Sequence, residues 1–206
     1  VMLWCDQGAS MRFNSIGTLP TKMDRARLLT LSLAILLNRG GERVGMTGAR
    51  LPPRRGNAQI LRLAEMLSEE DSAEYAPPEH SAMIPNAAAM LASDFLGNMA
   101  PVELALTKAA DRGVRGALLQ VLDPSEEEFG FHGRTIFESV GGSMRHETLK
   151  ANDLRGRYLA RLAQRKDELQ RLCVRTGWQY GLHNTEKSPQ SGLLWLYQAI
   201  SGGARL

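Results

Sequence analysis

The sequence predicts an α/β fold in which a doubly wound, mainly parallel sheet carries helices on both faces. Short apolar runs of strand length alternate along the chain with longer segments whose apolar residues recur at helical spacing, and this alternation is typical of βαβ units. The chain has 206 residues, of which 43% are hydrophobic and 23% are charged. This is enough to bury one core, so we expect a single domain over residues 1–206.

Apolar runs predict the strands of this sheet. The runs are Val1–Cys5, Arg43–Thr47, Ala87–Ala92, Val114–Leu122 and Trp178–His183. Two further runs, Arg134–Val140 and Ser143–Thr148, flank Gly141–Gly142. Two runs rich in β-forming residues and separated by two glycines predict a small antiparallel hairpin.

Helical spacing of apolar residues predicts the connecting helices. They cover Thr21–Asn38, Asn57–Ser68, Pro101–Arg112, Lys150–Thr176 and Leu193–Ile200. The first of them is apolar on nearly all sides over its second half, so we expect neighbours to cover most of it. Leu51–Gly56 and Glu69–Pro85 contain prolines and show no periodicity, and we expect both to be loops.

Composition argues against several classes of function. A net charge of +3 spread over the whole chain is too small to indicate binding to nucleic acid or to an anionic membrane. The longest apolar stretch, Leu28–Leu37, is too short to span a bilayer. Cys5 and Cys173 lie in apolar surroundings, and buried free thiols suit the reducing cytoplasm, where we expect the protein. Because the sequence begins at Val1, inside a predicted strand, we interpret it as a fragment of a longer protein.

Aspartates follow three of the predicted strands: Asp6, Asp94 and Asp123. The carboxyl ends of parallel strands meet at one edge of a sheet, where ligands bind. We therefore expect Asp6 and Asp94 to lie side by side there, with Asp123 on the next strand out. Clustered carboxylates repel one another, and a hard cation such as Mg²⁺ relieves that repulsion, with Ser10 able to add a hydroxyl ligand. The alternative interpretation is that these aspartates cap the loops and helices that follow them.

The segments around these aspartates resemble known families. Asp6-Gln-Gly-Ala-Ser10 is similar to D-x-S-x-S, the first motif of the metal-ion-dependent adhesion site in von Willebrand factor A domains, and Met90-Leu-Ala-Ser-Asp94 resembles the strand that supplies its distal aspartate. Over nearly its whole length the chain is similar to the bacterial family called domain of unknown function 58. The segments that carry this similarity are Lys22–Leu29, Leu37–Gly45, Ala92–Leu96, Arg112–Pro124, Gly133–Glu138 and Gly177–Tyr180.

The resemblance implies a von Willebrand A-like sheet that acts as a non-enzymatic protein-interaction module. Members of the family are often encoded beside AAA+ ATPases of the MoxR type, so the resemblance implies such an ATPase as a partner in the assembly or maturation of other proteins. The arm that precedes the first strand in the family is missing from this sequence.

The sequence departs from the adhesion-site pattern in two places. Gly8 stands where the pattern has a serine ligand. The later threonine ligand has no clear match, with Asn57 the nearest candidate by position and Thr47 a weaker one. The remaining ligand positions of the pattern are matched by Asp6, Ser10 and Asp94. The resemblance therefore implies a degenerate site in which Mg²⁺ is weakly bound or absent.

Two other groups of residues have a functional interpretation. Asp6-Gln-Gly8 also resembles the D-x-D loop of haloacid-dehalogenase-type phosphatases, so the alternative function is a small metal-dependent hydrolase, although Gly8 replaces the general acid that such an enzyme needs. Arg50, Arg54 and Arg55 form a basic cluster after the second predicted strand. This cluster is either a solvated loop or an anchor for an acidic protein partner near Asp6.

Overall fold

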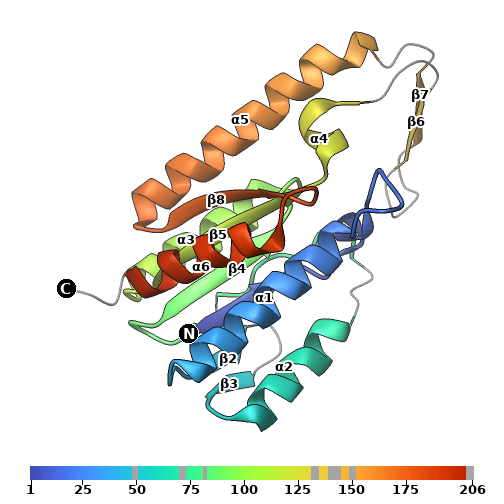
Figure 1. Cartoon of the computed structure of the whole chain (residues 1–206). Coiled ribbons are helices and arrows are strands. Elements are labelled where there is room, and N and C mark those ends of the chain that lie inside the picture. Colours follow the sequence, from blue (N-terminus) through green and yellow to red (C-terminus); the bar gives the residue numbers. More distant parts are fainter. Residues whose placement is uncertain are drawn as a thin grey trace.

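A computed structural model describes residues 1–47, 51–69, 73–80, 83–130, 135–138, 145–148 and 152–202. They form a six-stranded sheet in the order β3-β2-β1-β4-β5-β8 and a separate two-stranded hairpin (Figure 1). The parallel strands are β1 (Met2–Cys5), β2 (Val44–Met46), β4 (Ala88–Ser93), β5 (Arg115–Leu122) and β8 (Gln179–Asn184). β3 (Leu51–Arg54) pairs antiparallel with β2. The predicted doubly wound, mainly parallel sheet is confirmed.

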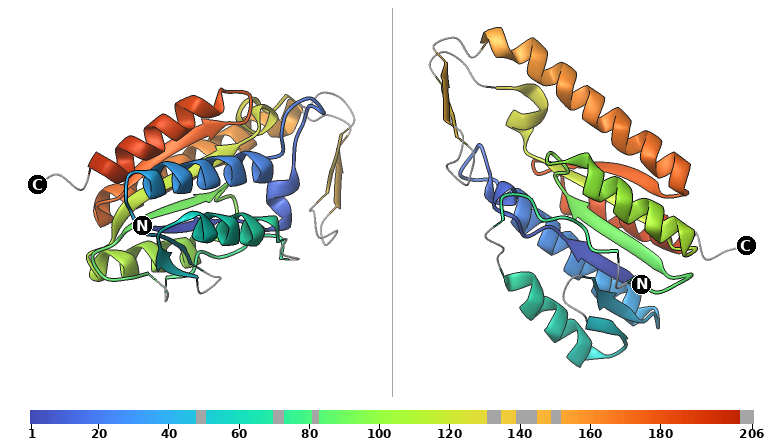
Figure 2. Two further views of the ribbon diagram at one scale, coloured as in Figure 1. Left: turned by 60° about the horizontal axis from the view of Figure 1, so that its bottom comes forward. Right: turned by 180° about the vertical axis from the view of Figure 1, so that it is seen from behind.

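Helices cover both faces of this sheet (Figure 2). One face carries α1 (Lys22–Arg39), α2 (Asn57–Ser68) and α6 (Pro189–Ser201), and the other carries α3 (Met99–Asp111) and α5 (Asn152–Thr176). Successive side chains of a strand point to opposite faces. Leu3 and Cys5 therefore pack toward α1, whereas Met2 and Trp4 pack toward α3. Burial on both sides explains why the parallel strands are continuous apolar runs. Each buried leucine contributes about 2 kcal/mol to the free energy of unfolding.

The start of α1 is set by a capping box. The Thr21 hydroxyl accepts a hydrogen bond from the backbone N–H of Asp24, and the Asp24 carboxylate accepts one from the backbone N–H of Thr21. Such reciprocal bonds satisfy donors that the first turn of a helix leaves unpaired. Lys22 therefore stands at the first helical position, at the end of the sheet where β1 and β4 finish.

One expectation about local structure needs correction, and two short elements were not predicted. Leu51–Gly56 was expected to be a loop, but its first four residues form β3. β3 is an edge strand, where the missing N–H groups of its two prolines need not cost a ladder hydrogen bond. The short α4 (Pro124–Glu128) and the 3-10 turn η1 (Ala9–Arg12) were not predicted, because elements of this length carry no periodic signal.

The hairpin between α4 and α5 agrees with prediction. β6 (Thr135–Glu138) and β7 (Arg145–Thr148) pair antiparallel, with Thr135 opposite Thr148. The predicted turn at Gly141–Gly142 lies outside the described residues. Figures 1 and 2 show the two strands projecting beyond the end of the main sheet.

Both cysteines are buried free thiols, as expected. Burial raises the pKa of each thiol to about 12, which keeps both protonated at neutral pH. Among the described residues, no helix combines the length and the apolar character that a membrane span requires.

Candidate functional site

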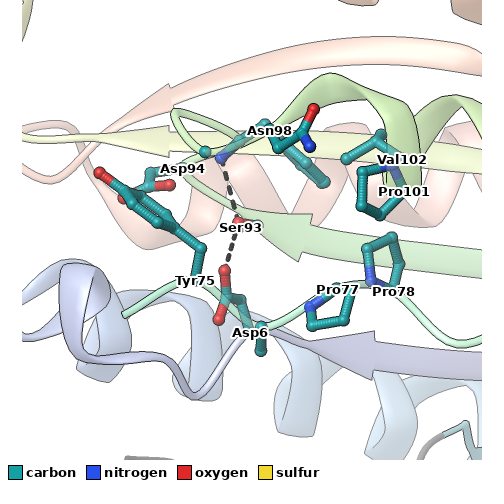
Figure 3. Close-up of a pocket in the computed structure, with 12 residues that line it drawn as sticks. Asp6, Tyr75, Pro77, Pro78, Ser93, Asp94, Asn98, Pro101 and Val102 are labelled. Carbon is teal, nitrogen blue, oxygen red and sulfur yellow. Dashed lines mark hydrogen bonds between the residues drawn. The ribbon is translucent and has the colours of Figure 1, made fainter. Parts of the chain in front are cut away.

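The sheet changes its winding direction between β1 and β4. The chain leaving β1 passes to α1 on one face, and the chain leaving β4 passes to α3 on the other. In open parallel sheets this switch point, at the carboxyl ends of the strands, is where ligands bind. Asp6 follows β1 and Asp94 follows β4, and these strands are hydrogen-bonded neighbours. The two aspartates therefore lie side by side at this end of the sheet, which we call the carboxyl edge (Figure 3).

Asp6 is a buried carboxylate held only by neutral donors. The Ser93 hydroxyl donates to its Oδ2 at 2.6 Å, and the Gly8 backbone N–H donates to its Oδ1 at 2.7 Å. No lysine or arginine of the described chain forms an ion pair with it. Burial raises the pKa of Asp6 to about 6, and the charge of Asp94 adds to the rise, whereas the hydrogen bonds from Ser93 and from the backbone of Gly8 and Ala76 offset only part of it. The ionised form of Asp6 is thus disfavoured in the fold.

A chain segment that crosses η1 explains why position 8 is glycine. The Ala9 N–H donates to the Ala73 carbonyl at 2.8 Å, and the Ser10 N–H donates to the Glu74 carbonyl at 2.9 Å. A Cβ atom at Gly8 would lie 2.9 Å from both the Glu74 carbonyl and Asp6 Oδ1. The serine of a complete D-x-S-x-S motif therefore cannot be accommodated here unless this segment moves.

Asp94 is paired with a buried lysine. Lys22 Nζ lies 2.8 Å from Asp94 Oδ2 and 2.6 Å from Glu126 Oε1, on α4. The Lys22 side chain is 1% exposed and that of Asp94 is fully buried. Asp94 Oδ1 also accepts the backbone N–H of Leu96 at 3.0 Å. This triad of Lys22, Asp94 and Glu126 joins α1, β4 and α4 at the carboxyl edge.

Asp123 directly follows β5, the neighbour of β4, and acts as the N-cap of α4. It accepts hydrogen bonds from the backbone and hydroxyl of Ser125 in α4 and of Ser15 in the loop before α1. Burial alone would raise the pKa of Asp123, but these hydrogen bonds outweigh it and lower the pKa. For this aspartate the capping interpretation is correct.

Replacing Asp123 with alanine is expected to lower the free energy of unfolding by about 2 kcal/mol, because a helix cap and the bonds to Ser15 are lost together. Asp123→Asn keeps one acceptor oxygen and should lose about half as much. Urea unfolding of both variants measures the difference. Equal stability of wild type and Asp123→Ala would contradict this role.

The space beside Asp6 is small. A cavity of about 80 Å³ lies between the segment that crosses η1 and the start of α3. Figure 3 shows Tyr75, Pro77 and Pro78 on one side and Pro101 and Val102 on the other. This volume is well below the roughly 300–1,000 Å³ of small-molecule sites.

Comparison with known proteins places the chain in a family. The family described as "Protein of unknown function DUF58" matches residues 1–168. The chain belongs to the DUF58 family. A search of curated proteins found no match.

Two crystal structures resemble this DUF58 chain over nearly its full length. The conserved hypothetical protein BatB from Bacteroides thetaiotaomicron is 16% identical, with a TM-score of 0.53 over 98% of this chain and 97% of that one. An aerotolerance-related membrane protein from Bacteroides fragilis, carrying multiple mutations to serine, is 15% identical, with a TM-score of 0.50 over 98% of each chain. At these identities the likeness shows a shared fold alone.

Other residues singled out in the DUF58 sequence lie apart from Asp6. Arg54 pairs with Val44, the first residue of β2, and the Gly56 N–H donates to Asn38 Oδ1 in the last turn of α1. Arg54, Arg55 and Asn57 therefore lie at the opposite end of the sheet from the carboxyl edge. The prediction that these residues lie near Asp6 was wrong, because β3 runs antiparallel and carries the chain away from that edge. Arg50 lies outside the described residues.

The residues at the carboxyl edge do not fit a resident Mg²⁺. Both oxygens of Asp6 accept hydrogen bonds, and Asp94 Oδ2 is bonded to Lys22. The weaker candidate Thr47 bonds to the Leu3 carbonyl. No group of three or more His, Cys, Asp or Glu side chains within the described part of the chain is arranged to hold a metal.

Ser10 is the candidate ligand beside Asp6 that keeps a free oxygen in the described structure. Its hydroxyl is buried and has no hydrogen-bond partner in the described structure. One neutral oxygen does not supply the charge or the geometry that Mg²⁺ requires.

Sequence reasoning missed the residues that surround the aspartates. Ser93 precedes Asp94 in a motif already singled out, and its hydroxyl at the end of a buried strand was an available signal. Lys22 opens a segment that carries the family resemblance, but nothing local shows that a lysine beside the cap Thr21 is buried. Glu126 occupies the third position after Asp123, which is typical of a capping box, and this pattern could have predicted α4.

Proposed function

We propose that this DUF58 chain is a non-enzymatic module that binds a protein partner at the carboxyl edge, between β1 and β4. The observation that carries the proposal is the filled switch point. Residues 75–78 occupy the place where an open α/β sheet binds small ligands and leave about 80 Å³ beside Asp6. A metabolite does not fit into this space beside Asp6, whereas the outer surface of the edge remains accessible to a protein.

The surface around the carboxyl edge supports this role. Tyr75, in the segment that covers Asp6, is 42% exposed, and Ile16, in the loop tied to Asp123, is 50% exposed. Aromatic and large aliphatic side chains are the usual anchors of protein interfaces. Asp6 adds a buried carboxylate whose charge is unfavourable to the fold, and groups kept at a cost to stability concentrate at functional sites.

The partner that we propose is a MoxR-type AAA+ ATPase, with which the chain acts in the assembly or maturation of other proteins. Membership of the DUF58 family supports this choice through the resemblance described above. The name of one structural neighbour, an aerotolerance-related membrane protein, describes a physiological role of that protein and names no partner.

Capture experiments test the proposal. The tagged chain is mixed with the purified MoxR-type ATPase of the same organism, and the retained ATPase is measured for wild type and for Asp6→Ala. We expect about a tenfold loss of retained ATPase for the variant, because the buried Asp6 carboxylate accepts a hydrogen bond from the Ala76 backbone and so helps to hold the exposed Tyr75 in place. Asp111→Ala is the matched control, because Asp111 is exposed at the last turn of α3, at the opposite end of the sheet. Equal capture by wild type and Asp6→Ala, both folded, would contradict the proposed site.

The hydrolase alternative has no supporting contact at the edge. Both oxygens of Asp6 are engaged by neutral donors, and Gly8 provides no general acid. Turnover of a generic phosphate ester by the wild type, abolished by Asp6→Asn, would overturn the non-enzymatic assignment.

A further inference from the structure

We propose that the ammonium group of Lys22 is a built-in cation of the carboxyl edge, standing at the point where a divalent metal ion would otherwise bind. The edge is therefore organised without a dissolved metal, and the role of Lys22 does not depend on which partner binds there.

The contacts of Lys22 are those of a bound cation. Its Nζ lies 2.8 Å from Asp94 Oδ2 and 2.6 Å from Glu126 Oε1, so two carboxylate oxygens from separate elements converge on one point. The side chain is 1% exposed and belongs to the largest fully buried side chains of the described core. The ring of Phe13 adds a cation–π contact, with its centroid 5.8 Å from Nζ.

The charge balance explains why the ammonium is required. The buried carboxylate of Asp94 and the partly buried carboxylate of Glu126 would repel each other without a cation between them, and Asp6 adds a third acidic group after the neighbouring strand. Burial lowers the pKa of Lys22, but the charges of Asp94 and Glu126 outweigh burial and hold that pKa above its ordinary value. The amine is therefore charged at neutral pH and meets the electrostatic requirement that Mg²⁺ would meet with two carboxylates and water.

The backbone delivers Lys22 to this point. The capping box between Thr21 and Asp24 places Lys22 at the first position of α1, and its own N–H donates to the Phe13 carbonyl at 3.2 Å. The ammonium is thus attached to a rigid helix start, and its local concentration does not vary with the ions in solution.

Removing the amine tests the proposal. The melting temperatures of wild type and Lys22→Ala are compared in EDTA and in rising MgCl₂ or MnCl₂. We expect the wild type to shift by less than about 1 °C, and Lys22→Ala to melt lower in EDTA and to recover by about 5 °C or more at about 10 mM metal, because the vacated point takes up the divalent ion.

Two further variants separate a cation site from an ordinary ion pair. Lys166 also bridges to α4, with Nζ 2.7 Å from Glu127 Oε1, but both side chains are partly exposed. Lys166→Ala should therefore gain no metal response. The double variant Lys22→Ala/Glu126→Gln should lose the response that Lys22→Ala gained, because one of the converging carboxylates is neutralised.

A metal-dependent rise in the wild-type melting temperature, or a folded Lys22→Ala whose melting temperature ignores metal, overturns the proposal. If Lys22→Ala does not fold, Mn²⁺ is added to isotope-labelled wild type. Unbroadened amide signals around Asp6 and Asp94 then support Lys22 as the resident cation, and selective broadening there refutes it.

Discussion

Asp94→Ala is expected to lower the free energy of unfolding by about 3–5 kcal/mol, because removing one partner leaves a buried charge without full compensation. Lys22 would keep only Glu126, and the Leu96 N–H would lose its acceptor. Asp94→Asn restores that acceptor but not the charge, so it should recover only a small part of the loss. Urea unfolding at neutral pH measures both variants.

Glu127→Gln is the control for this prediction. Glu127 also pairs with a lysine, Lys166, but its side chain is 20% exposed and that of Lys166 is 27% exposed. Partly exposed ion pairs contribute about 0–1 kcal/mol, so this change should be small. A loss below about 1 kcal/mol for Asp94→Ala would mean that the triad does not hold α1, β4 and α4 together.

In contrast to Asp94→Ala, Asp6→Asn is expected to raise the free energy of unfolding. The pKa of Asp6 is about 6 in the fold, against an ordinary value of 3.8. The folded state therefore binds the proton more tightly, so the contribution of Asp6 is fully present below about pH 4 and is lost as the pH rises through 6. Asparagine is neutral at every pH and can donate to Ser93 Oγ while accepting from the Gly8 N–H. We expect a gain of about 2–3 kcal/mol at pH 7.5.

The free energy of unfolding, measured from pH 4 to pH 8, checks the direction of this change in stability. The wild type should lose stability relative to Asp6→Asn as the pH rises through 6, and the two should converge toward pH 4. Asp123→Asn is a suitable control, because the pKa of Asp123 is lowered in the fold and its substitution should remove stability at neutral pH. Parallel curves for wild type and Asp6→Asn would show that Asp6 is not strained by burial. Together with weaker partner capture by Asp6→Ala, a stabilised Asp6→Asn would show that Asp6 is kept for function.

Local patterns in the sequence were sufficient to predict the sheet, the main helices and the position of the aspartates. Strands such as β4 and β5 are buried on both faces, so a continuous apolar run identifies them without any neighbour. α1 begins at a cap and ends near glycines, and these are local signals. Because parallel strands share a carboxyl edge, Asp6 and Asp94 could be placed together from their strand-end positions alone.

The surroundings of those aspartates follow from contacts between residues that are distant in the chain. Lys22 is 72 residues from Asp94 and 104 residues from Glu126 along the chain, and no local periodicity links these positions. Asn57 was misplaced because the antiparallel pairing of β3 reverses the chain direction, which the spacing of residues does not record. Buried charges are stable only when partners from distant elements meet them, so the chemistry of this edge follows from packing and not from a motif.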